Sequence, residues 1–196
     1  MLLSDELFDI VDDNNVIIGQ ATRGECHGNP QLIHRSVHVL VFNSRGEILL
    51  QKRPLDKDIQ PGKWDTSVGG HLDLGETFLA AAKREMKEEL GLEGIPLSYL
   101  YPSKIRNEIE SENIETFLAV TDQRIIPAPD EIDEVRFWTT DQIEELLGQY
   151  VFTPNFEEEW SAFSEFNRKY LNVDSGNLGL CAGNFFPNLL KEYPDI

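Results

Sequence analysis

The sequence predicts an α/β sandwich, a single domain in which helices cover a mixed central sheet. Two observations support this fold class. Short apolar segments with strand character recur between residues 7 and 138, and segments with helical periodicity lie between and after them. The chain has 196 residues, of which 40% are apolar and 27% charged. That length and balance are sufficient for a buried core in a globular protein.

The expected strands form two hairpins followed by single strands. In the second hairpin, Val37, Val39 and Val41 alternate with Leu40 and Phe42, so we expect both faces of that strand to be covered. The expected strand segments are 7–11, 16–19, 36–42, 47–50, 64–68, 97–101, 116–120 and 135–138, with polar turns at 12–15 and 43–46.

The strongest helical pattern covers residues 77–90, and Gly91 is well placed to end that helix. Two further helices are expected at 140–147 and 156–170. The apolar stripe of the first helix is predicted to contain Phe78, Leu79, Ala82, Met86 and Leu90.

The charge balance excludes several classes of partner. The 17 basic and 35 acidic residues give a net charge of −18, which disfavours nucleic acid and anionic membrane surfaces. Two distant cysteines, Cys26 and Cys181, and a first segment without the features of a signal peptide indicate a cytoplasmic protein. We expect the domain to span residues 1–172, and the tail, 173–196, to pack on the domain or on a partner subunit.

Three carboxylates in the first helix indicate chemistry. Glu85, Glu88 and Glu89 are three and four residues apart, so they lie together on the helix surface, beside the apolar stripe. Their mutual repulsion would be relieved by a hard cation such as Mg²⁺ or Mn²⁺. A solvated acidic face explains the same spacing, and the spacing alone does not decide between the two.

The flanking residues resemble a known signature. Five residues separate Gly70 from Glu76, and seven more precede the segment Arg84 to Leu92, which reads Arg-Glu-Met-Lys-Glu-Glu-Leu-Gly-Leu. This pattern resembles the Nudix hydrolase signature, G-x5-E-x7-R-E-U-x-E-E-x-G-U, at every fixed position. The resemblance covers roughly residues 7–147 and implies a Nudix-type α/β/α sandwich.

The resemblance also implies an activity and a site. Nudix enzymes cleave a diphosphate linkage, typically in a nucleoside diphosphate derivative, with Mg²⁺ that Mn²⁺ can replace. The implied metal ligands are Gly70, through its carbonyl, together with Glu85, Glu88 and Glu89. Glu76 is expected to pair with Arg84 and orient the loop against the helix. A small-molecule diphosphate is the implied substrate, and a homodimer is an assembly found among Nudix relatives.

Substrate contacts and the catalytic base are less determined by the sequence. Arg53, Lys57 and Lys63 are candidate phosphate contacts in the loop before the signature, and His71 is expected to line the cleft. The candidates for the base are Glu112, Glu115, Asp130, Glu131, Glu134 or a glutamate of the signature itself.

The chain also resembles the isopentenyl-diphosphate isomerase branch of this fold. Residues 64–71, Trp-Asp-Thr-Ser-Val-Gly-Gly-His, are similar to that family's W-T-N-S-V-C-G-H. His27, His34 and His71 match three metal histidines of the isomerases, and Glu112 matches a fourth ligand. Gly69 stands at the position of the catalytic cysteine, and Ile114 at that of a second motif glutamate. A second metal held by the histidines and a non-catalytic ligand-binding module are further alternatives.

Overall fold

The computed structural model describes residues 6–57 and 59–171. The strands are β1 Leu7–Val11, β2 Ile17–Thr22, β3 Ile33–Phe42, β4 Ile48–Lys52, β5 Trp64–Asp65, β6 Val68–His71, β7 Leu97–Arg106, β8 Ser111–Val120 and β9 Glu134–Trp138. The helices are α1 Arg23–Cys26, α2 Phe78–Leu90, α3 Thr140–Leu146 and α4 Pro154–Phe166, which continues as a π-helical turn, Asn167–Leu171.

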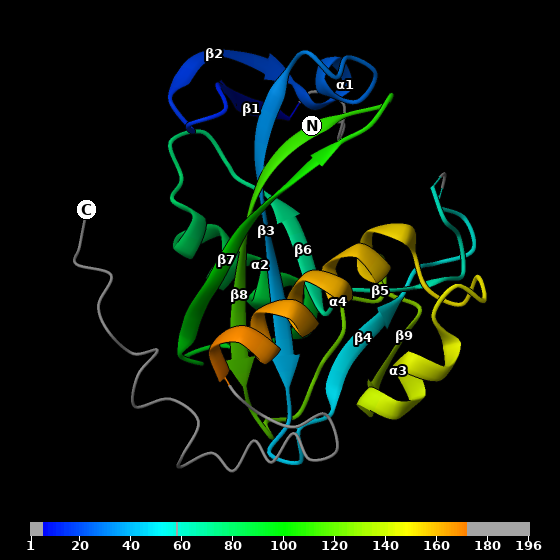
Figure 1. The fold of residues 1–196 in the computed structure, drawn as a ribbon. Coiled ribbons are helices and arrows are strands. Elements are labelled where there is room, and N and C mark those ends of the chain that lie inside the picture. The colour runs from blue at the N-terminus through cyan, green and yellow to red at the C-terminus, as the bar shows by residue number, and fades with distance from the viewer. Residues whose placement is uncertain (1–5, 58, 172–196) are drawn as a thin grey trace.

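The central sheet has seven strands in the order β5-β4-β3-β8-β7, with β6 also paired to β3 and β9 to β4. Strands β3 and β8 pair in parallel over their whole length, from Ile33 beside Ser111 to Phe42 beside Val120. The other pairs are antiparallel. The sheet is therefore mixed, as predicted. A separate hairpin of β1 and β2 lies across one end of β3 (Figure 1).

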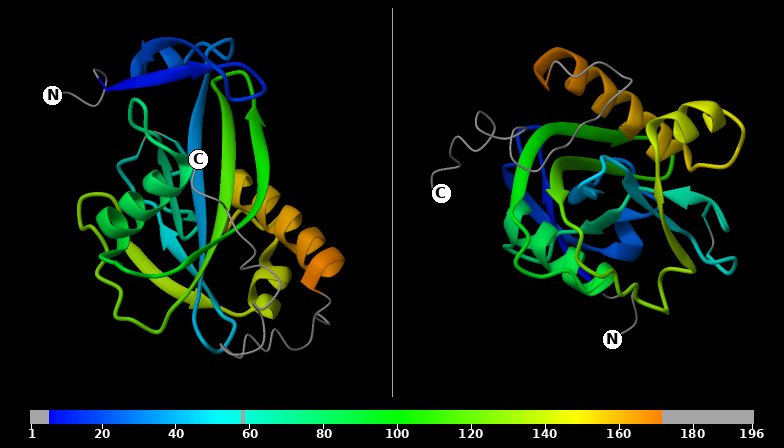
Figure 2. Two further views of the ribbon diagram at one scale, coloured as in Figure 1. Left: turned by 90° about the vertical axis from the view of Figure 1, so that its left-hand side faces the viewer. Right: turned by 90° about the horizontal axis from the view of Figure 1, so that it is seen from below.

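Helices cover both faces of this sheet, which confirms the predicted α/β sandwich. In Figure 2, α2 lies on one side of the long strands and α4 on the other. Two apolar clusters follow from this arrangement. The α2 side contains Val37, Val39 and Val41, and the α4 side contains Leu40 and Phe42. The predicted two-sided burial of this strand is thus confirmed.

Helix α2 has clear signals at both ends. The Thr77 side chain accepts a hydrogen bond from the Ala80 backbone N–H at the start, and Gly91 adopts a left-handed conformation (φ 67°) at the end. Its buried face consists of Ala81, Ala82, Met86, Glu89 and Leu90.

One expected member of the buried face is misplaced. Leu79 was expected in the apolar stripe, but it is 39% exposed, whereas Ala81 is fully buried. Ala81 belongs to the apolar cluster between α2 and the sheet, so the buried face is rotated away from Leu79.

The other elements differ from expectation mainly in length. Strands β7 and β8 extend five residues further than predicted, β7 at its C-terminal end and β8 at its N-terminal end. The short helix α1 was not predicted. Helix α4 starts at Pro154, after the Thr153 cap, rather than at Phe156. The predicted tail 173–196 lies outside the described residues. Within residues 6–57 and 59–171, none of the helices is long and apolar enough to cross a membrane.

Candidate active site

The carboxylates of α2 face strand β6 at its two glycines. A Cβ atom added to Gly70 would lie 2.1 Å from the Glu85 carboxyl carbon, so only glycine fits there. The Gly69 backbone N–H and the Gln51 side chain, at 3.1 Å, both donate to the Glu89 carboxylate. The helix and the glycine strand therefore hold two carboxylates against the backbone of residues 69 and 70.

Arg84 organises the loop and the helix around these carboxylates. Its Nε and Nη2 donate to the two oxygens of Glu76 at 3.1 and 2.8 Å, which is the predicted pair in a bidentate form. Nη2 also donates to the His71 carbonyl at 2.8 Å. Nη1 donates to Glu85 at 2.7 Å and to Glu88 at 3.1 Å. A single guanidinium thus fixes the 71–76 loop, the helix and two of the predicted ligands.

The buried carboxylates are reluctant to ionise. Burial raises the pKa of Glu85 to about 7, against the opposing effect of Arg84 and with contributions from Glu88 and Glu131. Burial, followed by the charges of Glu85 and Glu131, raises the pKa of Glu89 well above its ordinary value. Glu88 is exposed.

This arrangement fits a divalent cation. The charge of Glu88 acts against ionisation of Glu85, and that of Glu85 against ionisation of Glu89. Such mutual repulsion is the kind that a hard cation relieves. The Glu85 carboxylate fills the space that a Cβ at residue 70 would need. Close contact between Glu85 and this strand therefore requires glycine at residue 70. The predicted ligand residues Gly70, Glu85, Glu88 and Glu89 are therefore brought together, with Glu76 and Arg84 beside them.

The second predicted cluster also assembles. One side-chain nitrogen from each of His27, His34 and His71 lies within 4.8 Å of the other two, a geometry that could hold a metal ion. Glu112 Oε1 lies 3.3 Å from His34 Nε2 and 3.1 Å from His71 Nε2. The cluster lies under the β1–β2 hairpin, where the Phe8 ring stacks on His34 and His71.

The pKa values of Glu112 and His27 in this cluster are both lowered, for different reasons. Burial opposes ionisation of Glu112, but hydrogen bonds from His34 and His71 outweigh it and hold its pKa well below the ordinary value. Burial lowers the pKa of His27 to about 4, so this ring is neutral at pH 7. Its Nε2 lies 3.6 Å from Glu110 Oε2. Glu110 is therefore a second carboxylate beside the histidine cluster, in addition to Glu112.

The predicted phosphate contacts have other partners. Arg53 donates to Asp65 at 3.2 Å and to the Ile59 carbonyl at 3.0 Å, so it braces its own loop. Lys63 lies over the Tyr150 ring, 5.6 Å from its centroid. Lys57 is exposed. The assignment of Arg53 and Lys57 to substrate binding stays a prediction.

The candidate bases are separated by the fold. Glu112 belongs to the histidine cluster, and Glu115, on the same strand, faces Arg35. Glu134 lies 3.7 Å from Lys52. The charge of Glu131 raises the pKa of both Glu85 and Glu89, so Glu131 lies near the α2 carboxylates. Its loop is fixed to the end of α2, where the Ala128 N–H donates to the Glu89 carbonyl at 2.9 Å.

Three residues that contact the two sites were not predicted from the sequence. Gln51, Ser36 and Arg23 carried no motif, yet Gln51 binds Glu89, Ser36 Oγ donates to Glu112 at 2.7 Å, and Arg23 contacts His71 at 3.2 Å. Each reaches its partner through strand pairing or helix packing over a long sequence separation. The spacing of residues along the chain therefore held no signal for them.

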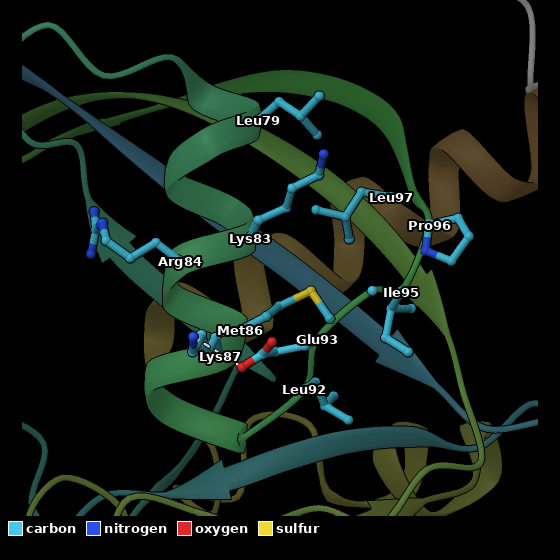
Figure 3. A pocket seen from close by; sticks show the side chains of 11 residues that line it. Leu79, Lys83, Arg84, Met86, Lys87, Leu92, Glu93, Ile95, Pro96 and Leu97 are labelled. Carbon is cyan, nitrogen blue, oxygen red and sulfur yellow. Dashed lines mark ion pairs between the residues drawn. The ribbon is translucent and has the colours of Figure 1, made fainter.

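A cavity of about 620 Å³ lies beside α2, on the flank that carries Leu79 and Lys83 (Figure 3). Leu79 and Lys83 line it together with the segment 92–97, and the Arg84 guanidinium points away from it. None of the three signature glutamates lines this cavity. It is therefore separate from the site at β6.

Comparison with known proteins decides the family. Residues 32–157 match the family model described as the NUDIX domain. The chain belongs to the Nudix family. An uncharacterized Nudix hydrolase of Yersinia pestis is 34% identical to it over 150 residues, which are 76% of this chain and 81% of that protein. An isopentenyl-diphosphate Delta-isomerase of Streptomyces coelicolor is 32% identical over 156 residues, 76% of this chain and 79% of the isomerase.

Solved structures agree on the Nudix fold. The structure of DR0079 from Deinococcus radiodurans aligns with a TM-score of 0.68 at 23% identity, over 84% of this chain and 99% of that one. A MutT protein from Methanosarcina mazei aligns with a TM-score of 0.60 at 22% identity, over 72% and 98%. The predicted resemblances to Nudix hydrolases and to the isomerase branch are both confirmed by these relatives.

Proposed function

We propose that this Nudix protein is a Mg²⁺-dependent hydrolase that cleaves a diphosphate linkage in a nucleoside diphosphate derivative or a similar small molecule. The observation that carries the proposal is the position of the largely buried Glu85 and the buried Glu89 against the glycine backbone of residues 69 and 70. Such a cluster is costly to keep charged, and it is suited to a cation that also binds phosphate oxygens.

The residues of this chain have distinct roles in the proposed reaction. Glu85, Glu88 and Glu89, with the Gly70 carbonyl, would hold the cation, which supplies charge neutralisation of the diphosphate and a more acidic bound water. Arg84 keeps Glu85 and Glu88 oriented through its bidentate bond to Glu76. The orientation of Glu85 and Glu88 matters because a metal ligand displaced by about 1 Å can lower the reaction rate by a factor of about 100.

Glu131 is our candidate for the general base. Its charge acts on both Glu85 and Glu89, so it lies at the edge of the same cluster, and its side chain is exposed to the solvent that supplies water. A carboxylate in this position can accept a proton from the attacking water.

The proposed function is tested by a hydrolysis screen. The purified protein is incubated with nucleoside diphosphate derivatives and Mg²⁺ or Mn²⁺, and the products are identified by mass. Glu88→Gln and Glu89→Gln are each expected to lower turnover by a factor of about 100 or more while the fold is retained. Glu93→Gln, an exposed carboxylate just beyond the helix, is the matched control. Wild-type turnover in either variant at saturating Mg²⁺ would exclude that residue as a ligand.

An isomerase-like function is favoured by two observations, the isomerase relatives and the intact histidine cluster. The chain lacks the cysteine thiol that the resemblance implies at position 69, and isoleucine occupies position 114. We therefore expect no conversion of isopentenyl to dimethylallyl diphosphate. Formation of dimethylallyl diphosphate above background would overturn this expectation, and it is measured on the same preparation as the hydrolysis screen.

The histidine cluster is proposed as a second metal site of the same protein. Neutral imidazoles and a carboxylate suit Zn²⁺ or Mn²⁺ better than Mg²⁺. Anomalous diffraction from crystals soaked in Mn²⁺ or Zn²⁺ tests it. A peak between His27, His34 and His71 supports the site, whereas peaks only at the α2 glutamates contradict it. A non-catalytic ligand-binding module would bind diphosphates but release no products in the screen.

A further inference from the structure

The cavity of about 620 Å³ beside α2 has a largely apolar lining. Figure 3 shows Leu79, Lys83 and Met86 pointing from α2 toward the segment 92–97. Met86 is only 2% exposed and Leu79 is 39% exposed. The segment 92–97 contributes four further apolar side chains: Leu92, Ile95, Pro96 and Leu97. Binding pockets in proteins have volumes of about 300–1,000 Å³, so this cavity is large enough to receive side chains of another segment.

Two lysines add positive charge to this lining. Lys83 and Lys87 are four residues apart on α2, line the cavity and are exposed. Lys87 Nζ lies 3.0 Å from Glu93 Oε1, whereas Lys83 makes no ion pair among residues 6–57 and 59–171. An occupant with an apolar surface and an acidic group would therefore complement both parts of the cavity.

The chain itself contains a segment of this composition. Residues 172–196 lie outside the described part of the chain. Their sequence contains four large apolar residues within a stretch of six: Phe185, Phe186, Leu189 and Leu190. Glu192 and Asp195 follow shortly after. Segments that remain in water are poor in aromatic and large aliphatic residues, so this composition favours binding to an apolar surface.

The described chain ends near the strand that leads away from the cavity. The Phe166 ring of α4 packs on Tyr101 of β7 with a centroid distance of 5.4 Å, and Tyr170 packs on Phe166 at 4.9 Å. Strand β7 begins at Leu97, which lines the cavity. This strand is the last in the sheet order, and α2 and α4 lie on opposite sides of the sheet (Figure 2). A chain that leaves α4 can therefore reach the cavity around the β7 edge.

The connecting length is sufficient for this path. Residues 172–184 connect Leu171 to Phe185. At about 3.3 Å per extended residue, these thirteen residues span at most about 43 Å. A compact domain of this size has a radius of gyration of roughly 15 Å, so the path around one sheet edge lies within reach. A segment tied to the same chain also has an effective concentration on the order of millimolar, which favours it over a separate protein.

We propose that residues 185–190 of the same chain bind in the cavity beside α2, with their aromatic and leucine side chains on its apolar lining and the acidic residues that follow near Lys83. The inference does not depend on the proposed hydrolase function, because none of the signature glutamates lines this cavity.

The methionines and cysteines of the chain make a direct test practicable. Met86 lines the cavity, and Met1 is the other methionine. Cys181 lies four residues before Phe185. Cys26 is fully buried, and burial, with a contribution from the neighbouring glutamate, raises its pKa to about 11, so Cys181 is the thiol expected to react. The full-length protein is labelled with ¹³C at its methionine methyl groups and with a nitroxide at Cys181.

We expect the nitroxide to remove more than half of the Met86 methyl signal, relative to the same protein after the nitroxide is reduced. Met86→Leu assigns the signal. The double variant Phe186→Ser, Leu189→Ser should restore the signal, because it removes apolar side chains of the proposed segment. Leu178→Ser, an equal change earlier in the tail, is the matched control and should leave the loss unchanged.

A variant of the cavity tests the other partner. Leu79→Ser should reduce the loss of the Met86 signal at least 2-fold, because Leu79 is an exposed apolar residue of the lining. Leu74→Ser is the matched control, since Leu74 is 43% exposed, similar to Leu79, but does not line the cavity. Circular dichroism checks that each variant is folded.

Three results would overturn the proposal. The first is a Met86 signal that the nitroxide does not change, and the second is a loss that persists in the Phe186→Ser, Leu189→Ser variant. The third comes from a mixture of ¹³C-labelled protein without nitroxide and unlabelled protein that carries it. An equally strong loss in this mixture would show that the tail of a second copy occupies the cavity.

Discussion

Replacing Glu85 by glutamine is expected to make the metal-free protein more stable at neutral and alkaline pH. The pKa of Glu85 is raised from 4.5 to about 7, chiefly by burial. Between these values the folded protein binds more protons than the unfolded chain, so the free energy of unfolding falls as the pH rises from 4.5 through 7. The shift is 7 − 4.5, or 2.5 units. At about 1.4 kcal/mol per unit, the loss is roughly 3 kcal/mol.

The assay is urea unfolding of both proteins in EDTA at several pH values from 4.5 to 8. Glutamine keeps the size of the side chain and an oxygen for Arg84, but it does not titrate in this range. We expect the stability advantage of Glu85→Gln to widen by roughly 3 kcal/mol across the range. Addition of Mg²⁺ should stabilise the wild type at pH 8 much more than the variant, because the cation binds the ionised carboxylate.

A matched control separates this effect from the general loss of one negative charge. Glu93→Gln removes a carboxylate just beyond α2 that is ion-paired with Lys87 and is 65% exposed. Because the chain has a net charge of −18, the stability of the Glu93→Gln variant measures how much the loss of any one negative charge stabilises the fold. Parallel stability curves for wild type and Glu85→Gln would refute the reasoning, since they would show that Glu85 ionises as readily in the folded protein as in the unfolded chain.

Three further predictions follow from the geometry. Gly70→Ala should lower turnover about 100-fold in steady-state assays and reduce stability by about 1–3 kcal/mol in urea unfolding, because the new methyl group overlaps the Glu85 carboxylate. Unchanged turnover would contradict the packing described here. Arg84→Lys keeps the charge but loses the fork to Glu76, so kcat should fall at least 10-fold with an unaltered circular dichroism spectrum. His34→Gln should lower the Zn²⁺ retained after dialysis, measured by mass spectrometry, and equal Zn²⁺ content would argue against a metal at the histidines.

The site on α2 was predictable because it is local. Helical spacing alone places Glu85, Glu88 and Glu89 together, and one short loop connects β6, which contains Gly70, to α2, which contains Arg84. The degree of burial of each α2 side chain was harder to predict from the sequence. The periodicity defined the stripe, but not which of its flanks the sheet would cover, so Leu79 was wrongly expected to be buried.

The histidine cluster shows the opposite case. His27, His34 and His71 were predicted to cluster only through the resemblance, because they come from the C-terminal end of α1, from β3 and from β6. Glu110 was not considered, since it approaches His27 only when β8 pairs in parallel with β3. Long-range pairing of this kind leaves no mark on the local spacing of either segment.

The two glycines of β6 have different neighbours on the two faces of the sheet. Gly70 has no room for a side chain because Glu85 fills that space on the α2 face, and Gly69 allows His38 to approach on the α4 face. A Cβ at residue 70 would overlap the Glu85 carboxylate, so a side chain there would push a predicted metal ligand away from the strand. A Cβ at residue 69 would instead lie 3.4 Å from His38 Cδ2 on the other face. Glycine at residue 70 is therefore required by the carboxylate of α2, whereas the close packing at residue 69 involves an imidazole on the opposite side of the sheet.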